Sequence, residues 1–318
     1  MTEVAFLKQN ARKWKQMEQF LSGADATDPD QLADLFQEIT DDLSYSQTFY
    51  PGSRTTQYLN DLARQLHQRI YRNKREDRGR FRRFWARELP LLFAEARTEL
   101  WISLVALLLG VTIGAFSAAN DESFVRLIMG DGYVNMTLEN IEKGDPLAVY
   151  KDTDPLTMFV RITVNNIMVS LYAFVAGLFF SLGTVVILFR NGVMLGAFQQ
   201  FFHRYSLLGQ SFLTIYIHGA LEISAIVIAG AAGLVVGNSI LFPGTFTRGQ
   251  SFRNGARKGL KMVIGLAPVF IAAGFLESFV TRFTGMPLWL SLVIILGSFA
   301  AVFWYVVWYP MQLKREGL

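Results

Sequence analysis

The chain has 318 residues, of which 52% are hydrophobic, and its formal net charge at pH 7 is +4. This composition is typical of a membrane protein with basic cytoplasmic loops rather than of a nucleic-acid-binding protein. The chain contains no cysteine. Disulfides, thiolate nucleophiles and cysteine-based metal sites are therefore excluded.

Residues 1–98 are largely polar and predict a cytoplasmic helical domain. Apolar residues recur at helical spacing in three stretches, at 7–21, 32–43 and 59–70. Each stretch has one apolar face and is joined to the next by a short connection. We therefore expect a small antiparallel bundle.

The end of this domain is strongly basic. Between Arg69 and Arg87 there are nine arginines and lysines against two acids, interleaved with Phe81, Phe84 and Trp85. Such a pattern fits either a nucleic-acid patch or a helix lying on anionic lipid headgroups. Because a long apolar run begins soon afterwards, we predict the interfacial helix and no nucleic-acid partner.

Residues 99–318 hold nearly every long apolar run and predict an all-α, polytopic membrane helix bundle. A hydrocarbon core about 30 Å thick requires roughly 20 helical residues to cross. On this basis we predict six spans, at residues 100–118, 165–189, 192–209, 211–237, 260–280 and 288–309.

Loop charges predict the orientation of these spans. Residues 119–164 carry eight acids against four bases and are expected to form an extracytoplasmic loop, whereas the basic loop 238–258 is expected inside. Residues 192–209 must then cross, although they are only patchily apolar. With six crossings, the N- and C-termini are both cytoplasmic. The alternative is a re-entrant 192–209 segment and five crossings.

The stretch from Ser211 to Gly237 is the apolar span around which we expect the bundle to be organised. It contains one acid, Glu222, and one histidine, His218, a helical turn apart. Glu222 lies near the middle of the bilayer, where a carboxylate is costly unless it is neutral or partnered. We therefore expect this span inside the bundle rather than facing lipid.

Further polar residues are predicted at similar depths, and we expect one buried polar cluster that opens outward. The predicted cluster comprises His218, Glu222, Glu277, Gln199, Gln200 and His203. Its predicted outer mouth comprises Arg161, Asn165 and Asn166.

Three interpretations of these polar residues remain open. They could bond one another and fix the register of the bundle, or they could line a path for an ion, a proton or a small polar solute. In that second case, Glu222 would carry the proton or cation with His218 as its partner. The third interpretation is a metal-assisted intramembrane hydrolase, with His218 and Glu222 as metal ligands. However, HGALE is not the HExxH motif and the sequence identifies no third ligand, so we predict no cofactor and no enzyme activity.

Small residues predict close helix packing. Gly230, Gly233 and Gly237 follow Glu222 in the same span. Glycines four residues apart, a spacing that places both on one helix face, occur in four pairs: Gly110/Gly114, Gly192/Gly196, Gly233/Gly237 and Gly255/Gly259. Such pairs serve either packing inside one chain or an interface between copies, and we favour a homodimer.

Two segments resemble the stage II sporulation protein M family. They are NNIMVSLYAFVAGLFFSLGTVVILFRNGVMLGAF and HGALEISAIVIAGAAGLVVG, and the resemblance covers about Leu100 to Pro310. It implies a multi-pass protein of the cytoplasmic membrane in bacteria or archaea. In spore formers, family members are regarded as non-enzymatic scaffolds that work with partner peptidoglycan hydrolases.

From this resemblance we expect a scaffold that recruits other membrane or envelope proteins. The present chain differs from the shorter sporulation members by its long helical front domain, so a role in sporulation is not carried over.

Overall fold

The computed structural model describes residues 1–22, 29–72, 79–148, 154–283 and 286–315. The regular elements in these ranges are all helical, which confirms the predicted fold class. The chain divides into two compact units, Met1–Phe81 and Arg82–Leu318, and each is described by itself.

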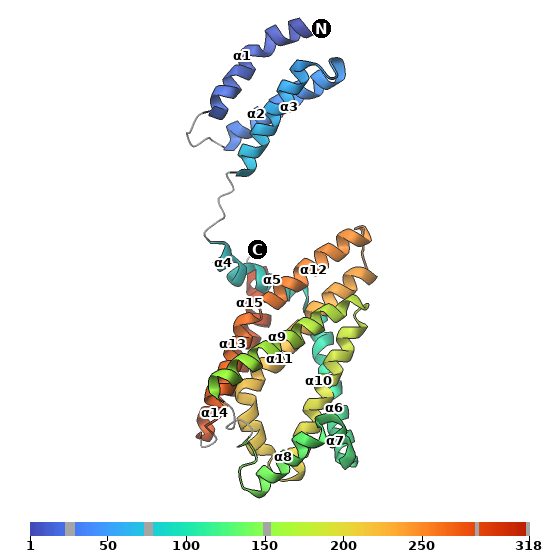
Figure 1. Ribbon diagram of the computed structural model, residues 1–318, viewed down its shortest axis with the longest axis vertical. Helices are drawn as coiled ribbons and strands as arrows, with labels where there is room; N and C mark the ends of the chain where they lie inside the picture. Colours follow the sequence, from blue (N-terminus) through green and yellow to red (C-terminus); the bar gives the residue numbers. More distant parts are fainter. Residues whose placement is uncertain (23–28, 73–78, 149–153, 284–285, 316–318) are drawn as a thin grey trace. The chain divides into compact units, whose positions relative to one another are not determined.

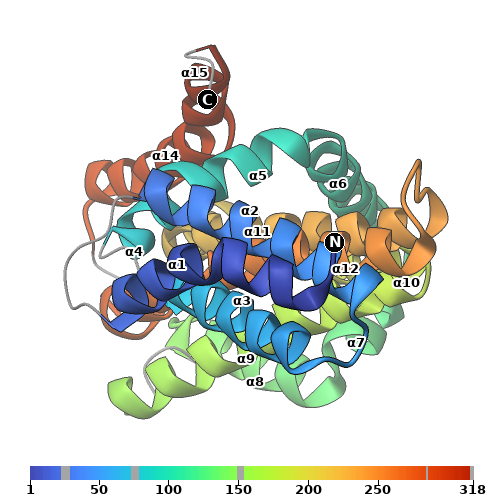
Figure 2. The same ribbon diagram turned by 90° about the horizontal axis from the view of Figure 1, so that it is seen from above.

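The first unit contains three helices that lie alongside one another (Figure 2). They are α1 (Glu3–Ser22), α2 (Pro29–Phe49) and α3 (Arg54–Arg72). Helix α2 begins with Pro29. Proline lacks an N–H group, and it is tolerated there because the N–H groups of the first helical turn have no partner within the helix. The turn before α3 contains Gly52, whose φ of +79° suits glycine. The apolar faces of all three helices form one core, made of Phe6, Trp14, Met17, Ile39, Leu59, Leu62 and Leu66.

The second unit contains six helical segments that are long and apolar enough to cross a membrane, counted over the described residues. The prediction of six spans is therefore confirmed. They are α6 (Arg97–Asn120), α9 (Pro155–Val175) with η3 (Ala176–Leu178), α10 (Leu182–Arg204), α11 (Leu208–Leu241), α12 (Arg248–Ile264) with α13 (Ala267–Phe275) and η4 (Leu276–Val280), and α14 (Leu288–Phe303) with η5 (Trp304–Trp308) and α15 (Tyr309–Arg315).

Shorter helices lie at the two ends of this bundle (Figure 1). At one end α4 (Arg80–Arg83), η1 (Phe84–Glu88) and α5 (Leu89–Glu95) precede the first span, and α5 packs against α12 and α15. We call this the α12 end. At the opposite end, which we call the cap end, α7 (Glu122–Met129) and α8 (Asp131–Glu142) connect the first span to the second.

Helix α11 is the centre of the bundle, because it contacts α6, α9, α10, α12, α13 and α14. Its buried positions are mostly alanine and glycine, with His218 among them. Without bulky side chains, the helix axes of its neighbours can approach closely. The prediction that the span 211–237 lies inside the bundle is therefore confirmed.

Helices α6 and α10 form a close parallel pair, seen side by side in Figure 1. A Cβ atom added at Gly192 or Gly196 would overlap the backbone carbonyl of Leu107 or Val111, respectively. Gly110 and Gly114 make the reciprocal approach to the backbone of α10. These two pairs therefore serve packing inside one chain.

The glycines of α11 are used in the same way. Gly230 packs against Ser103 and Leu188, Gly233 against Ala173 and Thr184, and Gly237 against Ser181. The remaining pair, Gly255/Gly259, packs on α11 and Phe174. Since all four pairs have neighbours within the chain, they no longer argue for a homodimer.

The second and third spans differ in their boundaries from the sequence prediction. The sequence predicts 165–189 and 192–209, separated near Arg190. In the structure α9 begins at Pro155, so the connection 119–164 is shorter than predicted, and the chain turns at 179–181. Phe180 and Ser181 adopt positive φ angles of 53° and 67° in this turn. Two of the three turn residues, Phe179 and Phe180, are apolar, so hydropathy gives no sign of the break. As a result α10 is a full-length span of 23 residues rather than a short or re-entrant one.

Candidate functional site

His218, Glu222 and Glu277 meet inside the membrane unit, and we call them the His–Glu cluster. His218 and Glu222 occupy positions i and i+4 of α11 and therefore lie on one face of that helix. Glu277 comes from η4, in the fifth span. One nitrogen or oxygen of each side chain lies within 4.8 Å of the others. The side chains of His218 and Glu277 are only 4% and 14% exposed, so the cluster is largely shielded.

Two further polar residues bond to two of these side chains, Glu222 and His218. The Asn166 amide of α9 donates a hydrogen bond to Glu222 Oε1. Thr281 Oγ1 lies 3.0 Å from His218 Nδ1 and donates its own proton to the carbonyl oxygen of Leu276, at 3.2 Å. The cluster is therefore tied to α9, α11 and the end of the fifth span.

The local fold of the fifth span explains how Glu277 and Thr281 both reach α11. Residues 276–280 form a π-helical turn, in which the Thr281 N–H bonds to Leu276 O at 2.8 Å, five residues back. This wider turn changes the phase of the helix and points both side chains toward α11. π-Turns of this kind recur at functional sites.

The electrostatics of the cluster demand a positive charge. His218 Nε2 and Glu277 Oε1 are 3.8 Å apart, and the Glu222 carboxylate faces the same space. One charged residue at the bilayer centre costs about 2.5–3.5 kcal/mol on insertion scales, and two carboxylates this close would also repel one another. Protons or a bound cation are therefore required between them.

The other predicted site residues fall into two groups. Asn166 joins the His–Glu cluster, whereas Arg161 and Asn165 lie exposed on α9. Gln199, Gln200 and His203 belong to the cap end of α10 instead. The side-chain amide of Gln199 is buried and forms no hydrogen bond within the described residues, so it does not bond to the cluster.

Sequence reasoning missed three polar residues near the cluster. They are Thr281, which bonds to His218, and Thr163 and Ser278. The hydroxyls of Thr163 and Ser278 are buried without a hydrogen-bond partner in the described part of the chain. The signal available was a run of hydroxyl residues in an otherwise apolar segment, since Ser278 and Thr281 closely follow Glu277.

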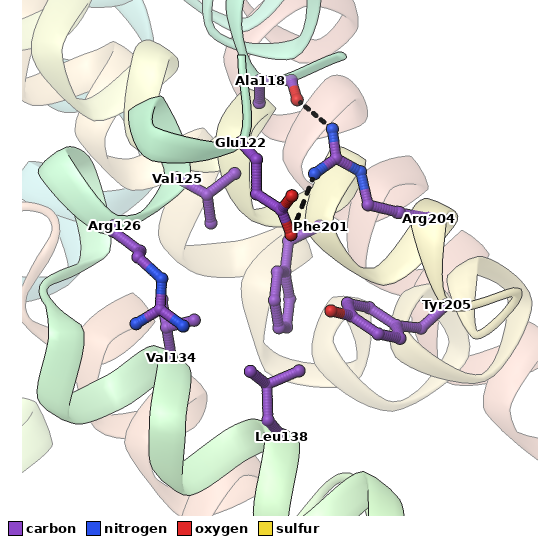
Figure 3. A pocket seen from close by; sticks show the side chains of 9 residues that line it. All are labelled: Ala118, Glu122, Val125, Arg126, Val134, Leu138, Phe201, Arg204 and Tyr205. Carbon is purple, nitrogen blue, oxygen red and sulfur yellow. Dashed lines mark hydrogen bonds and ion pairs between the residues drawn. The ribbon is translucent and has the colours of Figure 1, made fainter. Parts of the chain in front are cut away.

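A separate polar contact closes the cap end (Figure 3). The Arg204 guanidinium lies 3.5 Å from the Glu122 carboxylate and donates to the Ala118 carbonyl oxygen at 3.1 Å. The cavity beside this contact, lined also by Phe201 and Tyr205, has a volume of about 20 Å³. That is room for about one water molecule, so the contact joins α10 to α6 and α7 rather than forming a binding site.

A second cavity of about 130 Å³ lies near the α12 end. It is lined by Leu92, Glu95, Ala96, Glu99, Val235, Lys258 and Met262. Neither of these two cavities is lined by a residue of the His–Glu cluster.

Comparison with known proteins places this architecture in a family. The model of SpoIIM, described as stage II sporulation protein M, matches residues 103–282. The chain belongs to this family. The SpoIIM match includes every residue of the His–Glu cluster together with Asn166 and Thr281, and it ends before α14. This result confirms the resemblance inferred from the sequence.

The N-terminal part matches a different family. A domain of unknown function (DUF8413) matches residues 4–72, which include the three helices of the first unit almost entirely. No curated protein and no solved structure matches the chain.

Proposed function

We propose that this SpoIIM-family protein is a non-enzymatic scaffold in the cytoplasmic membrane of a prokaryote, where it recruits other membrane or envelope proteins. The observation that carries this proposal is the division of the chain into two compact units, each with its own core. A separately folded helical unit attached to a membrane bundle provides a surface for partners that the membrane unit need not share.

The membrane unit supports the same proposal. The two cavities described above are small, about 20 Å³ and 130 Å³, and neither reaches the His–Glu cluster. The cluster residues instead bond across helices, as Asn166 does to Glu222. Such contacts fix the register of a bundle, which is what a scaffold requires.

The distribution of basic residues supports cytoplasmic N- and C-termini. At the α12 end, Lys258 and Lys261 pair with Glu95 and Glu88 at 2.6 Å and 2.9 Å, respectively. Lys314 of α15 donates to the Ala94 carbonyl oxygen at 3.3 Å in the same region. Basic residues from two parts of the chain, α12 and α15, therefore gather at one end, as the positive-inside rule expects of the cytoplasmic side.

Cysteine labelling tests this orientation cleanly, because the native chain has no cysteine. Asp145→Cys and Gln250→Cys are expected to react with a membrane-impermeant maleimide from opposite sides of the membrane. Labelling of both from the same side would contradict the proposed topology.

The scaffold proposal is tested by comparing the full chain with a variant that lacks residues 1–81. Both are expressed in the native host, crosslinked in intact cells and purified from membranes. We expect a defined set of proteins to accompany the full chain and to fall at least tenfold with the truncated variant at equal insertion. Identical recovery with both chains, or no specific protein with either, would contradict recruitment through the N-terminal unit.

Transport of a cation or proton is the second candidate function, favoured by the meeting of two acids and a histidine inside the bundle. The test is ion or proton flux into proteoliposomes with the wild type, Glu222→Gln and Glu99→Gln. Glu99 is a suitable control because it is a glutamate of α6 that bonds to Asn238 outside the cluster. Flux lost only in Glu222→Gln favours transport, whereas absence of flux in all three favours the scaffold.

Under either function, Glu222→Gln is expected to insert normally but to impair the cellular role. Complementation equal to that of the wild type would remove Glu222 from the functional residues.

A further inference from the structure

We propose that His218, Glu222 and Glu277 bind one zinc ion, which joins α11 to η4 inside the membrane unit. This site goes beyond the scaffold function and does not depend on it, because a structural ion could serve any role of the bundle. Three features of the cluster support such a site: the distances among the ligand atoms, the hydrogen bonds around them, and the chemistry of the ligand set.

The distances leave room for a metal ion among the three side chains. His218 Nε2 and Glu277 Oε1 are 3.8 Å apart. A hydrogen bond between such atoms would require about 2.7–3.2 Å, so these two atoms are not hydrogen-bonded to one another. Zinc binds nitrogen and carboxylate oxygen at about 2.0–2.2 Å, which places two ligands of a tetrahedral ion about 3.4 Å apart. The whole set lies within 4.8 Å, so small side-chain rotations complete the site.

The surrounding hydrogen bonds leave acceptor atoms facing the centre. Thr281 Oγ1 bonds to both Leu276 O and His218 Nδ1. When its proton goes to Leu276 O, it accepts the Nδ1–H of His218, and the lone pair of the imidazole is then on Nε2. Asn166 donates to one oxygen of Glu222 from the outside. A histidine whose second nitrogen is held by an oxygen, and a carboxylate held by an amide, form the outer shell that metal ligands require.

The ligand types select the metal. Calcium and magnesium prefer sites built from six or more oxygens, whereas one imidazole with two carboxylates suits zinc and neighbouring transition metals. With three protein ligands, the fourth position would be taken by water. Thr163 and Ser278 lie three residues from Asn166 and one residue from Glu277 in the sequence, and their buried hydroxyls have no hydrogen-bond partner among the described residues, so they are candidates to bond such a water.

The experiment measures zinc bound to the full chain in detergent. The protein is stripped with a chelator, reloaded with Zn²⁺, freed of excess metal on a desalting column and analysed for zinc by mass spectrometry. We expect one zinc per wild-type chain. Glu277→Gln and His218→Gln should bind at least a hundredfold more weakly, and Asn166→Ala about 10–100-fold more weakly because only the outer shell is lost.

Matched controls use the same substitutions outside the cluster. His203→Gln on α10 and Glu99→Gln on α6 are expected to retain one zinc per chain. Cobalt substitution adds a spectroscopic check, because a tetrahedral Co²⁺ site absorbs strongly in the visible range, and this absorption should disappear in Glu277→Gln.

A second measurement covers the case in which a variant fails to fold. Zinc added to the stripped wild type should raise its unfolding temperature, and magnesium at the same concentration should not. Stripped wild type that binds no zinc above the level of a metal-free control protein would overturn the proposal and leave shared protons as the explanation. Undiminished binding in a folded Glu277→Gln or His218→Gln variant would also overturn it.

Discussion

The two units of this chain are both helical, yet they are held together by different kinds of side chain. The core of the N-terminal unit consists of large residues, such as Trp14, Met17 and Leu66. In the membrane unit, the central helix α11 buries mainly alanine and glycine. Bulky apolar residues such as Trp101 and Phe116 are instead exposed on the outside of the bundle.

The difference follows from the solvent around each unit. In water, burial of large apolar side chains stabilises a fold by about 25 cal/mol per Å² of buried surface. In lipid, that driving force between helices is absent, because acyl chains are as apolar as leucine. Close backbone contact and polar contacts between helices must then hold the bundle. In this bundle, the pair α6–α10 provides close backbone contact and the His–Glu cluster provides polar contact.

The largest expected effect is that of Trp14→Ala. Trp14 is 3% exposed, packs edge-on against Phe6, and donates from Nε1 to Asp42 at 2.8 Å. Loss of a buried tryptophan costs about 3–5 kcal/mol, which is comparable to the whole stability of a small helical unit. Limited proteolysis of the full chain should then cleave the N-terminal unit rapidly while the membrane unit stays intact.

Phe49→Ala is the control for this prediction, because Phe49 is 58% exposed in the same unit. Its cleavage rate should match that of the wild type. If Trp14→Ala also made the membrane unit sensitive to protease, the two units would not be independent. The conclusion that each is stabilised by its own kind of contact would then be wrong.

Gly192→Leu is expected to have the largest effect on the membrane unit. A side chain there would collide with the backbone of α6 at Leu107, which cannot move aside as a side chain can. The cost should exceed the about 1–3 kcal/mol of an overpacked core. The measurement is the temperature at which the protein loses its monodisperse peak in detergent.

The matched control is Gly297→Leu in α14, because a Cβ at Gly297 meets nothing within 4 Å. This variant should unfold at the wild-type temperature. A similar loss in both variants would show that helix flexibility, rather than close contact, is what the glycines provide.

The sequence was sufficient to predict features that depend on local spacing. Helical periodicity predicted the N-terminal core, and hydropathy with loop charge predicted six spans. The i, i+4 spacing placed His218 and Glu222 on one face of their helix. In each case, the residues that determine the feature are close together in the chain.

Features that depend on contacts between distant segments could not be predicted from the sequence alone. Glu277 was expected at a similar depth, but its meeting with His218 depends on how two helices rotate about their axes and on the π-turn at 276–280. The turn at 179–181 contains Phe179 and Phe180, which are as apolar as the spans that it joins, so hydropathy does not predict it. Whether the glycine pairs pack within one chain or between copies is likewise decided by the tertiary structure.

A smaller effect is expected when one buried hydroxyl is removed from each unit. In the membrane unit, Thr184 Oγ1 donates to Ala173 O at 2.7 Å. In the N-terminal unit, Thr55 Oγ1 donates to Glu3 at 2.8 Å. Hydrogen bonds between membrane helices average about 0.6 kcal/mol, and those in soluble proteins contribute about 1 kcal/mol. Thr184→Val and Thr55→Val should therefore lower the stability of their own units by similar amounts.

Denaturant titration of the full chain, followed by hydrogen exchange in each unit, measures both changes. A cost above about 3 kcal/mol for Thr184→Val alone would mean that polar contacts, more than close packing, hold the bundle together.

The smallest expected effect is that of pH on the helix N-termini, and it should differ between the two units. At the cap end, Asp121 begins α7 by accepting from the side chain and backbone N–H of Ser123, and Asp154 begins α9 by accepting from the N–H of Thr157. These hydrogen bonds lower the pKa of both carboxyl groups. In the N-terminal unit, α3 is capped by the Ser53 hydroxyl, which accepts from the Thr56 N–H and does not titrate in this range.

Because the pKa values of Asp121 and Asp154 are lower in the folded state, their contribution to stability is present above the ordinary carboxyl pKa of about 4. It is lost as the pH falls through the lower, folded values. Hydrogen exchange, corrected for its intrinsic pH dependence, should show the first turns of α7 and α9 opening more at pH 3 than at pH 6, with no change in α3. In Asp121→Asn and Asp154→Asn, the neutral amide oxygen still accepts the hydrogen bonds, so this response should disappear. If it persisted in both variants, the acid sensitivity would arise from other groups, and the choice of cap would not distinguish the two units.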